Sequence, residues 1–105
     1  MYIERAFTHR DQFFAAIAEA VSTLPAGVIS VTPTLGTDWA GESAVFFEVI
    51  LADDAVPRDK LLEFTKQISW AIVMQVRPLE EWGVLYYFDF LTQAEKSRIK
   101  EPSWA

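Results

Sequence analysis

Two segments of the chain, Ser43–Leu51 and Val84–Leu91, are apolar on both faces of the strands that they predict. Side chains alternate along a strand, so each segment supplies one row of residues to each face of a sheet. One row in each segment is free of charge: Val45, Phe47, Val49 and Leu51, then Val84, Tyr86, Phe88 and Phe90. The second rows contain Ala44, Phe46, Glu48 and Ile50, then Leu85, Tyr87, Asp89 and Leu91. Both faces of the predicted sheet therefore need cover.

Two other segments have apolar residues at helical spacing. The first helix is predicted to begin near Thr8, which has the spacing of a capping box with Asp11, and to end at Pro25–Gly27. The second is predicted to end near Val76, because Arg77-Pro78 follows. The two apolar stripes are Phe13, Ile17, Val21 and Leu24, then Leu61, Phe64, Ile68 and Ile72.

A third strand is predicted at Val28–Thr34, joined to Ser43–Leu51 as an antiparallel hairpin by the loop Leu35–Glu42. Met1–Phe7 has two interpretations, an edge strand or an irregular lead-in. The order (β)αββαβ predicts an α+β fold, a two-layer sandwich with a mainly antiparallel sheet and two helices on one face. If the first segment is a strand, the order matches a ferredoxin-like split βαβ.

The length of 105 residues suits a single domain, which we expect to span residues 1–91. Residues 92–105 are predicted to be a polar C-terminal tail with a lone tryptophan, Trp104, whose role the pattern leaves open.

Composition excludes several classes of function. Cysteine is absent, which excludes disulfides, zinc-thiolate sites and thiol nucleophiles and favours a cytoplasmic location. A formal net charge of −6 opposes direct binding to nucleic acid. No apolar segment approaches the roughly 20 residues that a membrane-spanning helix needs, so we expect no membrane association.

Catalytic motifs are missing. His9 is the single histidine, and neither a spaced histidine pair for a metal nor a nucleophile elbow accompanies it. The tripeptide His9-Arg10-Asp11 matches the catalytic loop of protein kinases, but the chain is too short for that fold and lacks the other kinase motifs. We therefore expect no catalytic residues, no metal site and no cofactor, and a non-enzymatic protein is favoured over an enzyme.

Two helices can cover one face of the sheet, which leaves the face bearing Glu48 and Asp89 open to a partner or a ligand. The two carboxylates have three interpretations: an acid–base pair, solvated charges, or partners of Arg or Lys across an interface. A tryptophan in a glycine-bounded loop adds a second feature typical of binding surfaces. The predicted binding residues are Trp39, Phe46, Glu48, Ile50, Leu85, Tyr87 and Asp89.

The favoured function is a small acidic protein-interaction module, of the inhibitor, antitoxin, immunity or accessory-subunit type. It would associate through the open face, either as a homodimer or with another protein, since burying its large apolar side chains offsets the cost of association. The alternative is a small ferredoxin-like dimeric enzyme or ligand-binding protein with a pocket near Glu48 and Asp89.

Overall fold

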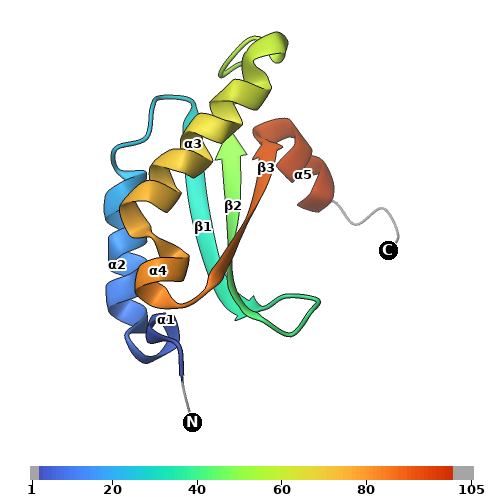
Figure 1. The fold of residues 1–105 in the computed structure, drawn as a ribbon. Helices are drawn as coiled ribbons and strands as arrows, with labels where there is room; N and C mark the ends of the chain where they lie inside the picture. The colour runs from blue at the N-terminus through green and yellow to red at the C-terminus, as the bar shows by residue number, and fades with distance from the viewer. Residues whose placement is uncertain (1–2, 101–105) are drawn as a thin grey trace.

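The computed structural model describes residues 3–100, and the side chains of residues 3–98 (Figure 1). The elements are α1 (Arg5–Thr8), α2 (Arg10–Val21), β1 (Val28–Thr37), β2 (Ser43–Leu51), α3 (Leu61–Val76), α4 (Pro78–Trp82), β3 (Leu85–Thr92) and α5 (Gln93–Lys100). A short 3₁₀ turn, Arg58–Lys60, leads into α3. The predicted α+β class is confirmed.

The sheet has three strands in the order β1-β2-β3. β1 pairs with β2 antiparallel, as the predicted hairpin requires. β2 pairs with β3 in parallel, and α3 and α4 form the crossover that a parallel pair needs. The sheet is therefore mixed, and the prediction of a mainly antiparallel sheet is wrong for one of its two strand pairs.

The ferredoxin-like arrangement is not confirmed. It needed a strand at Met1–Phe7, whereas Arg5–Thr8 is helical and residues 1–2 lie outside the described part of the chain. In a split βαβ unit a strand separates the two strands that the crossover joins. Here β2 and β3 are direct neighbours, with a continuous register from Ala44 opposite Leu85 to Leu51 opposite Thr92.

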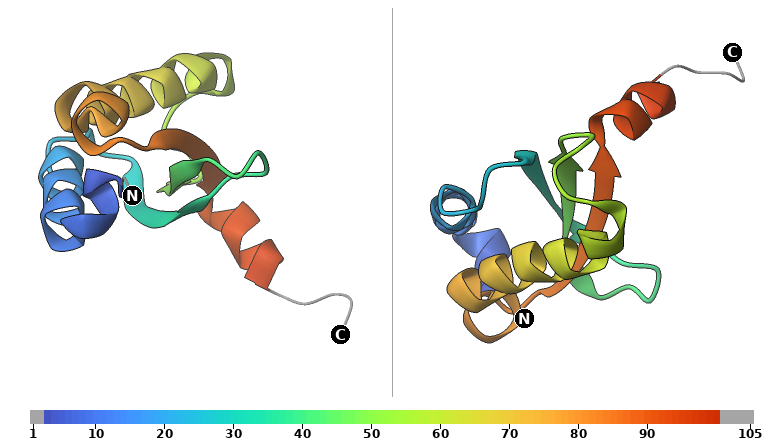
Figure 2. Two further views of the ribbon diagram at one scale, coloured as in Figure 1. Left: turned by 60° about the horizontal axis from the view of Figure 1, so that its bottom comes forward. Right: turned by 90° about the horizontal axis from the view of Figure 1, so that it is seen from above.

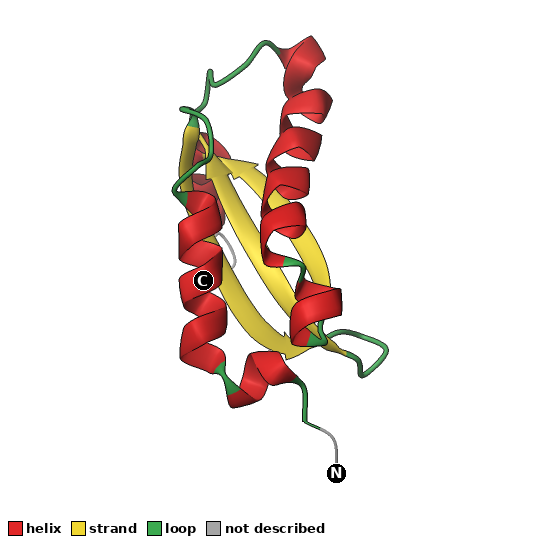
Figure 3. Cartoon of the chain, turned by 60° about the vertical axis from the view of Figure 1, so that its left-hand side comes forward, coloured by secondary structure: helices red, strands yellow, loops and turns green. Residues whose placement is uncertain are grey.

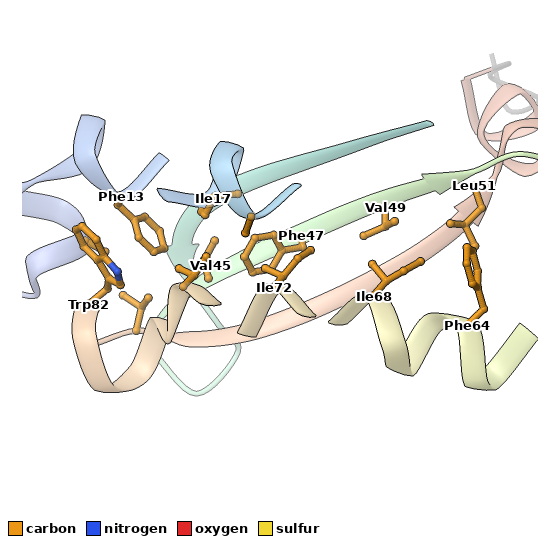
Figure 4. Close-up of a cluster of buried hydrophobic side chains, with 14 residues drawn as sticks. Phe13, Ile17, Val45, Phe47, Val49, Leu51, Phe64, Ile68, Ile72 and Trp82 are labelled. Atoms are coloured by element: carbon orange, nitrogen blue, oxygen red, sulfur yellow. The ribbon is translucent and has the colours of Figure 1, made fainter. Parts of the chain in front are cut away.

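Both long helices, α2 and α3, lie on one face of the sheet (Figure 3). The charge-free row of β2 points into this layer and is buried, as predicted. It meets Phe13 and Ile17 of α2 and Phe64, Ile68 and Ile72 of α3 (Figure 4). Each fully buried side chain of this kind contributes about 1.5–3 kcal/mol.

The corresponding row of β3 is less completely covered. Val84, just before the strand, is buried, and Phe88 and Phe90 pack against the core while partly exposed. Tyr86 is 40% exposed. The helix layer thus covers β2 fully and β3 in part.

The predicted C-terminal end of α3 is confirmed, whereas the predicted N-terminal cap of α2 is wrong. α3 ends at Val76 as predicted, and Arg77 takes a left-handed conformation with a φ of 52°. α2 begins one residue beyond α1, with His9 as its N-cap residue and no side-chain cap. The predicted capping box is wrong, because Thr8 belongs to α1 and its Oγ1 donates to the carbonyl of Arg5.

The segment predicted as a polar tail begins with the helix α5. Thr92 and Glu95 form a reciprocal capping box, in which the Thr92 N–H donates to Glu95 Oε1 at 2.9 Å and the Glu95 N–H donates to Thr92 Oγ1 at 3.2 Å. Ala94 N–H also donates to Asp53 Oδ1 at 2.9 Å, which ties α5 to the loop after β2. Trp104 lies outside the described residues.

Helices between residues 3 and 100 are too short or too polar to cross a bilayer.

Candidate functional site

The sheet face turned away from α2 and α3 is called the open face below. Strand register places Thr32, Glu48 and Asp89 in one line across its three strands. The next line consists of Thr34, Phe46 and Tyr87. The strand alternation read from the sequence therefore brings Glu48 and Asp89 side by side, as expected.

The open face is partly covered by its own chain. Ile50 is only 7% exposed, so the prediction that it is uncovered is wrong. Phe46, Leu85, Tyr87 and Leu91 are half-buried. At one end of this face, α5 contacts β2 and β3 and leaves the sheet on the side opposite α3 (Figure 2). Towards the other end, the rings of Trp39, Phe46 and Tyr87 partly cover one another.

Glu48 is paired with a cation from this helix. Lys96 Nζ donates to Glu48 Oε1 at 2.7 Å, and both side chains are about one-third exposed. This ion pair lies within the chain, whereas the sequence interpretation placed such pairs across an interface, which stays a prediction. Asp89, its neighbour in the register, is exposed.

Asp38 organises the β1–β2 loop, a role that the sequence reading missed. Its Oδ1 accepts hydrogen bonds from the backbone N–H groups of Ala40 and Glu42, both at 2.9 Å. Its Oδ2 accepts the Tyr87 hydroxyl at 2.8 Å, and the residue is 9% exposed. Aspartate followed by small loop residues is a known turn signal, and it could have been found at Asp38-Trp39-Ala40-Gly41.

These hydrogen bonds move the pKa values of both partners in opposite directions. The Glu42 N–H, followed by the Tyr87 hydroxyl, lowers the pKa of Asp38 below its ordinary value of 3.8. The same bond to Asp38 raises the pKa of Tyr87 above its ordinary value of 10.0, and desolvation adds to the rise. Between these two limits the bond joins an ionised carboxylate to a neutral phenol.

Trp39 projects from this loop and is 83% exposed. Its ring is 5.1 Å from that of Tyr87, which in turn stacks on Phe46 at 5.4 Å. Asp38 therefore bonds to the loop backbone that follows Trp39 and also to the Tyr87 side chain against which the indole packs. The indole packs against Tyr87 and is otherwise exposed to solvent.

A shallow hollow of about 410 Å³ adjoins this aromatic group on the open face. Its lining includes Thr32 and Thr34 of β1, Phe46 and Glu48 of β2, and Asp89 of β3. Phe46 is shared by the hollow and the aromatic stack. The surface formed by Trp39, Tyr87, Phe46 and this hollow is called the Trp39 surface below.

A second hollow, of about 750 Å³, lies where the parallel strands β2 and β3 end. The charged residues that line it are Asp53, Asp54, Arg58, Glu95 and Arg98. Carboxyl ends of neighbouring parallel strands are common places for clefts, but the pairing of β2 with β3 was not known beforehand.

Across residues 3–98, no three potential metal-ligating side chains gather into a cluster that could hold an ion. Comparison of the chain with protein-family profiles, curated proteins and solved structures gave no match in any of the three. Function is therefore inferred from the geometry of this chain alone.

Proposed function

We propose that this chain is a protein-interaction module that uses the Trp39 surface to bind a basic segment of another protein. The observation that carries the proposal is the exposed indole of Trp39, which packs against the ring of Tyr87. Asp38 in turn accepts a hydrogen bond from the hydroxyl of that tyrosine. Tryptophan is enriched among the residues that dominate binding energy. Contact with the Tyr87 ring restricts the indole, and a restricted side chain loses less conformational entropy when a partner covers it.

Charge favours a basic partner. Asp89 and Glu42 are exposed near the aromatic stack, and the chain as a whole carries −6. Lys96, the cation that reaches this face, is already paired with Glu48. A lysine or arginine on the partner would meet Asp89, while an apolar neighbour covers Trp39. Such recognition fits an inhibitor, antitoxin, immunity or accessory-subunit role.

One observation favours the alternative, a ligand-binding protein or enzyme with its site near Glu48 and Asp89. The hollow of about 410 Å³ lies between these residues and Phe46, and binding pockets combine apolar walls with a few polar groups. The pairing of Glu48 with Lys96 and the exposure of Asp89 make the interaction module the better supported function. Buried, unpaired carboxylates would suit acid–base chemistry better.

A peptide selection tests the proposal. A random peptide library is selected on the immobilised full chain, with Trp39→Ala protein as the counter-selection and circular dichroism as the folding control. Retained peptides should carry Lys or Arg beside an apolar residue. Their affinity should fall about 30-fold or more in Trp39→Ala, since truncation of a central tryptophan costs about 2 kcal/mol or more.

Two further variants locate the charge contact. Asp89→Asn should weaken the selected peptides about threefold, as expected for an exposed ion pair. Trp70→Ala is the matched control, because Trp70 is 67% exposed on α3, away from this face, and should leave binding unchanged. Peptides that bind wild type and Trp39→Ala equally, or that carry acidic rather than basic residues, contradict the proposal.

A further inference from the structure

The two edges of the sheet differ in how readily they can accept another strand. β1 contains Pro33 and an irregularity in register between Val28 and Ser30. A proline in an edge strand removes an outward N–H donor, and a bulge twists the edge away, so both oppose further pairing. β3 has neither feature along Leu85–Thr92.

The outer edge of β3 is unpaired in the described part of the chain. β3 pairs with β2 on one side, and no strand of residues 3–100 lies on its other side. Apart from the ladder to β2, the described backbone hydrogen bonds include none from residues 85–91. An uncapped strand edge of this length presents N–H and C=O groups in the pattern that a further strand needs.

Apolar and aromatic positions of β3 are arranged symmetrically about Phe88, except for Tyr87 and Asp89 on its two sides. If two copies pair antiparallel with Phe88 facing Phe88, then Leu85 faces Leu91, Tyr86 faces Phe90 and Tyr87 faces Asp89. Three of these four kinds of pair bring apolar or aromatic residues together, and such cross-strand pairs stabilise a sheet. The exception is Tyr87, which faces the carboxylate of Asp89. A pair centred on Asp89 would instead place two carboxylates opposite each other, which is unfavourable.

The aromatic side chains of β3 gain cover in this arrangement. Phe88 stacks on Phe47 at 4.7 Å and on Phe90 at 5.9 Å, and Tyr86 meets Phe88 edge-on at 6.2 Å. This row faces the helix layer, yet Tyr86 is still 40% exposed and the two phenylalanines are only partly buried. A second copy would continue the row with its own three aromatic rings.

We propose that two copies of this chain pair through β3, antiparallel and about a two-fold axis at Phe88, so that one sheet runs through both. A two-fold contact uses the same patch twice, which is what the near-symmetry of β3 provides. β3 contributes Tyr87 and Asp89 to the Trp39 surface, but the dimer is argued from the backbone edge of β3 and from the row of Tyr86, Phe88 and Phe90 on the other side of the sheet. The proposal therefore does not depend on the proposed function.

The proposal is tested by measuring the molar mass of the protein in solution over a range of concentrations. Light scattering or sedimentation equilibrium on the full chain, up to about 1 mM, should show a monomer–dimer equilibrium. Tyr86→Lys should weaken it roughly tenfold or more, because the Tyr86–Phe90 contact occurs twice and lysine blunts a strand edge. Trp70→Lys, on the outer side of α3, and Thr32→Lys, on the open face of β1, should leave the equilibrium unchanged.

Amide hydrogen exchange of the wild-type protein supplies a readout that needs no substitution. Raising the concentration into the dimeric range should slow exchange in β3 and leave β1, at the far edge of the sheet, unchanged. The proposal is overturned by a monomer at every concentration. It is overturned equally by a dimer that Thr32→Lys or Trp70→Lys disrupts while Tyr86→Lys does not, or by protection that omits β3.

Discussion

Asp38 and Tyr87 are 49 positions apart in the sequence, and the Tyr87 hydroxyl donates a 2.8 Å hydrogen bond to Oδ2 of Asp38. This contact joins the loop between β1 and β2 to the edge strand β3. It also places two titratable groups where each shifts the pKa of the other. Stability should therefore depend on pH at both ends of the range.

At acid pH, the change in stability should come from Asp38. Its folded-state pKa is below 3.8, so its contribution to stability is complete above that pH and is lost as the pH falls through the lower folded value. In Asp38→Asn the free energy of unfolding should be reduced at neutral pH, and its deficit relative to wild type should shrink below about pH 3.8. Urea denaturation at a series of pH values measures this. Tyr87→Phe should retain part of the dependence, because the Glu42 N–H still donates to Asp38; a deficit independent of pH contradicts the prediction.

At alkaline pH, the change in stability should come from Tyr87. A folded-state pKa above 10.0 means that the stabilising contribution is complete below pH 10.0 and is lost as the pH rises through the folded value. Ultraviolet difference titration should show one tyrosine that ionises later than an unfolded reference. The shift should become smaller in Asp38→Asn, since the bond to the carboxylate is its largest cause. An unchanged titration in that variant would be the contrary result.

Among the side chains of β2, truncation of Phe47 should reduce the free energy of unfolding most. It is almost completely buried and stacks on Phe88 at 4.7 Å. Phe47→Ala should lower the free energy of unfolding by about 3–5 kcal/mol, measured by chemical denaturation. Trp70→Ala, which truncates another aromatic side chain at an exposed site, should change the free energy of unfolding by no more than about 0.5 kcal/mol. Similar losses in the two variants would show that the core assignment is wrong.

The capping box at Thr92 should control the order of α5. Thr92→Ala removes the hydroxyl that accepts the Glu95 N–H, at a cost of about 1 kcal/mol. Amide exchange along α5 should become about fivefold faster, because local opening is favoured by the same amount. Thr92→Ser keeps the hydroxyl and serves as the control. Equal exchange in the alanine and serine variants would mean that the cap has no such role.

Arg77 adopts a backbone conformation that suits glycine. Its φ is 52°, and its side chain contacts Glu80 at 3.2 Å and Glu81 at 3.7 Å in exposed ion pairs. The left-handed conformation costs a non-glycine residue about 1–2 kcal/mol, whereas exposed ion pairs contribute less. Arg77→Gly should therefore be more stable than Arg77→Ala by about 1 kcal/mol in thermal or chemical unfolding, since both variants lose the ion pairs. If alanine is the more stable replacement, backbone strain is not the controlling factor.

Much of the core could be predicted from the sequence because two patterns are long. Apolar side chains alternate along all of β2, and the apolar stripe of α3 continues over several helical turns. Burial of Val45, Phe47 and Val49 against Ile68 and Ile72 follows directly from those two patterns. Helices of four or five residues, such as α1 and α4, are too short to show a helical period. The α5 helix does have a local signal in the sequence, the capping-box spacing of Thr92 and Glu95.

The candidate site was predictable only in part. Alternation placed Glu48 beside Asp89, and the glycine-bounded loop drew attention to Trp39. The contact of Asp38 with Tyr87 depends on which strand lies beside β2, and the strand order is not written in any local pattern. The same holds for Lys96, whose approach to Glu48 follows from the path of α5 across the open face.

The central place of β2 also governs the order in which this chain can assemble. Its antiparallel neighbour is joined to it by a short loop, whereas the parallel neighbour is synthesised only after α3 and α4. Closing a short loop costs less entropy, so the hairpin should form first and the third strand should dock last. During translation, one side of β2 then lacks hydrogen-bond partners until β3 has been synthesised. The nascent protein is most prone to aggregation in that interval, before Leu85 leaves the ribosome.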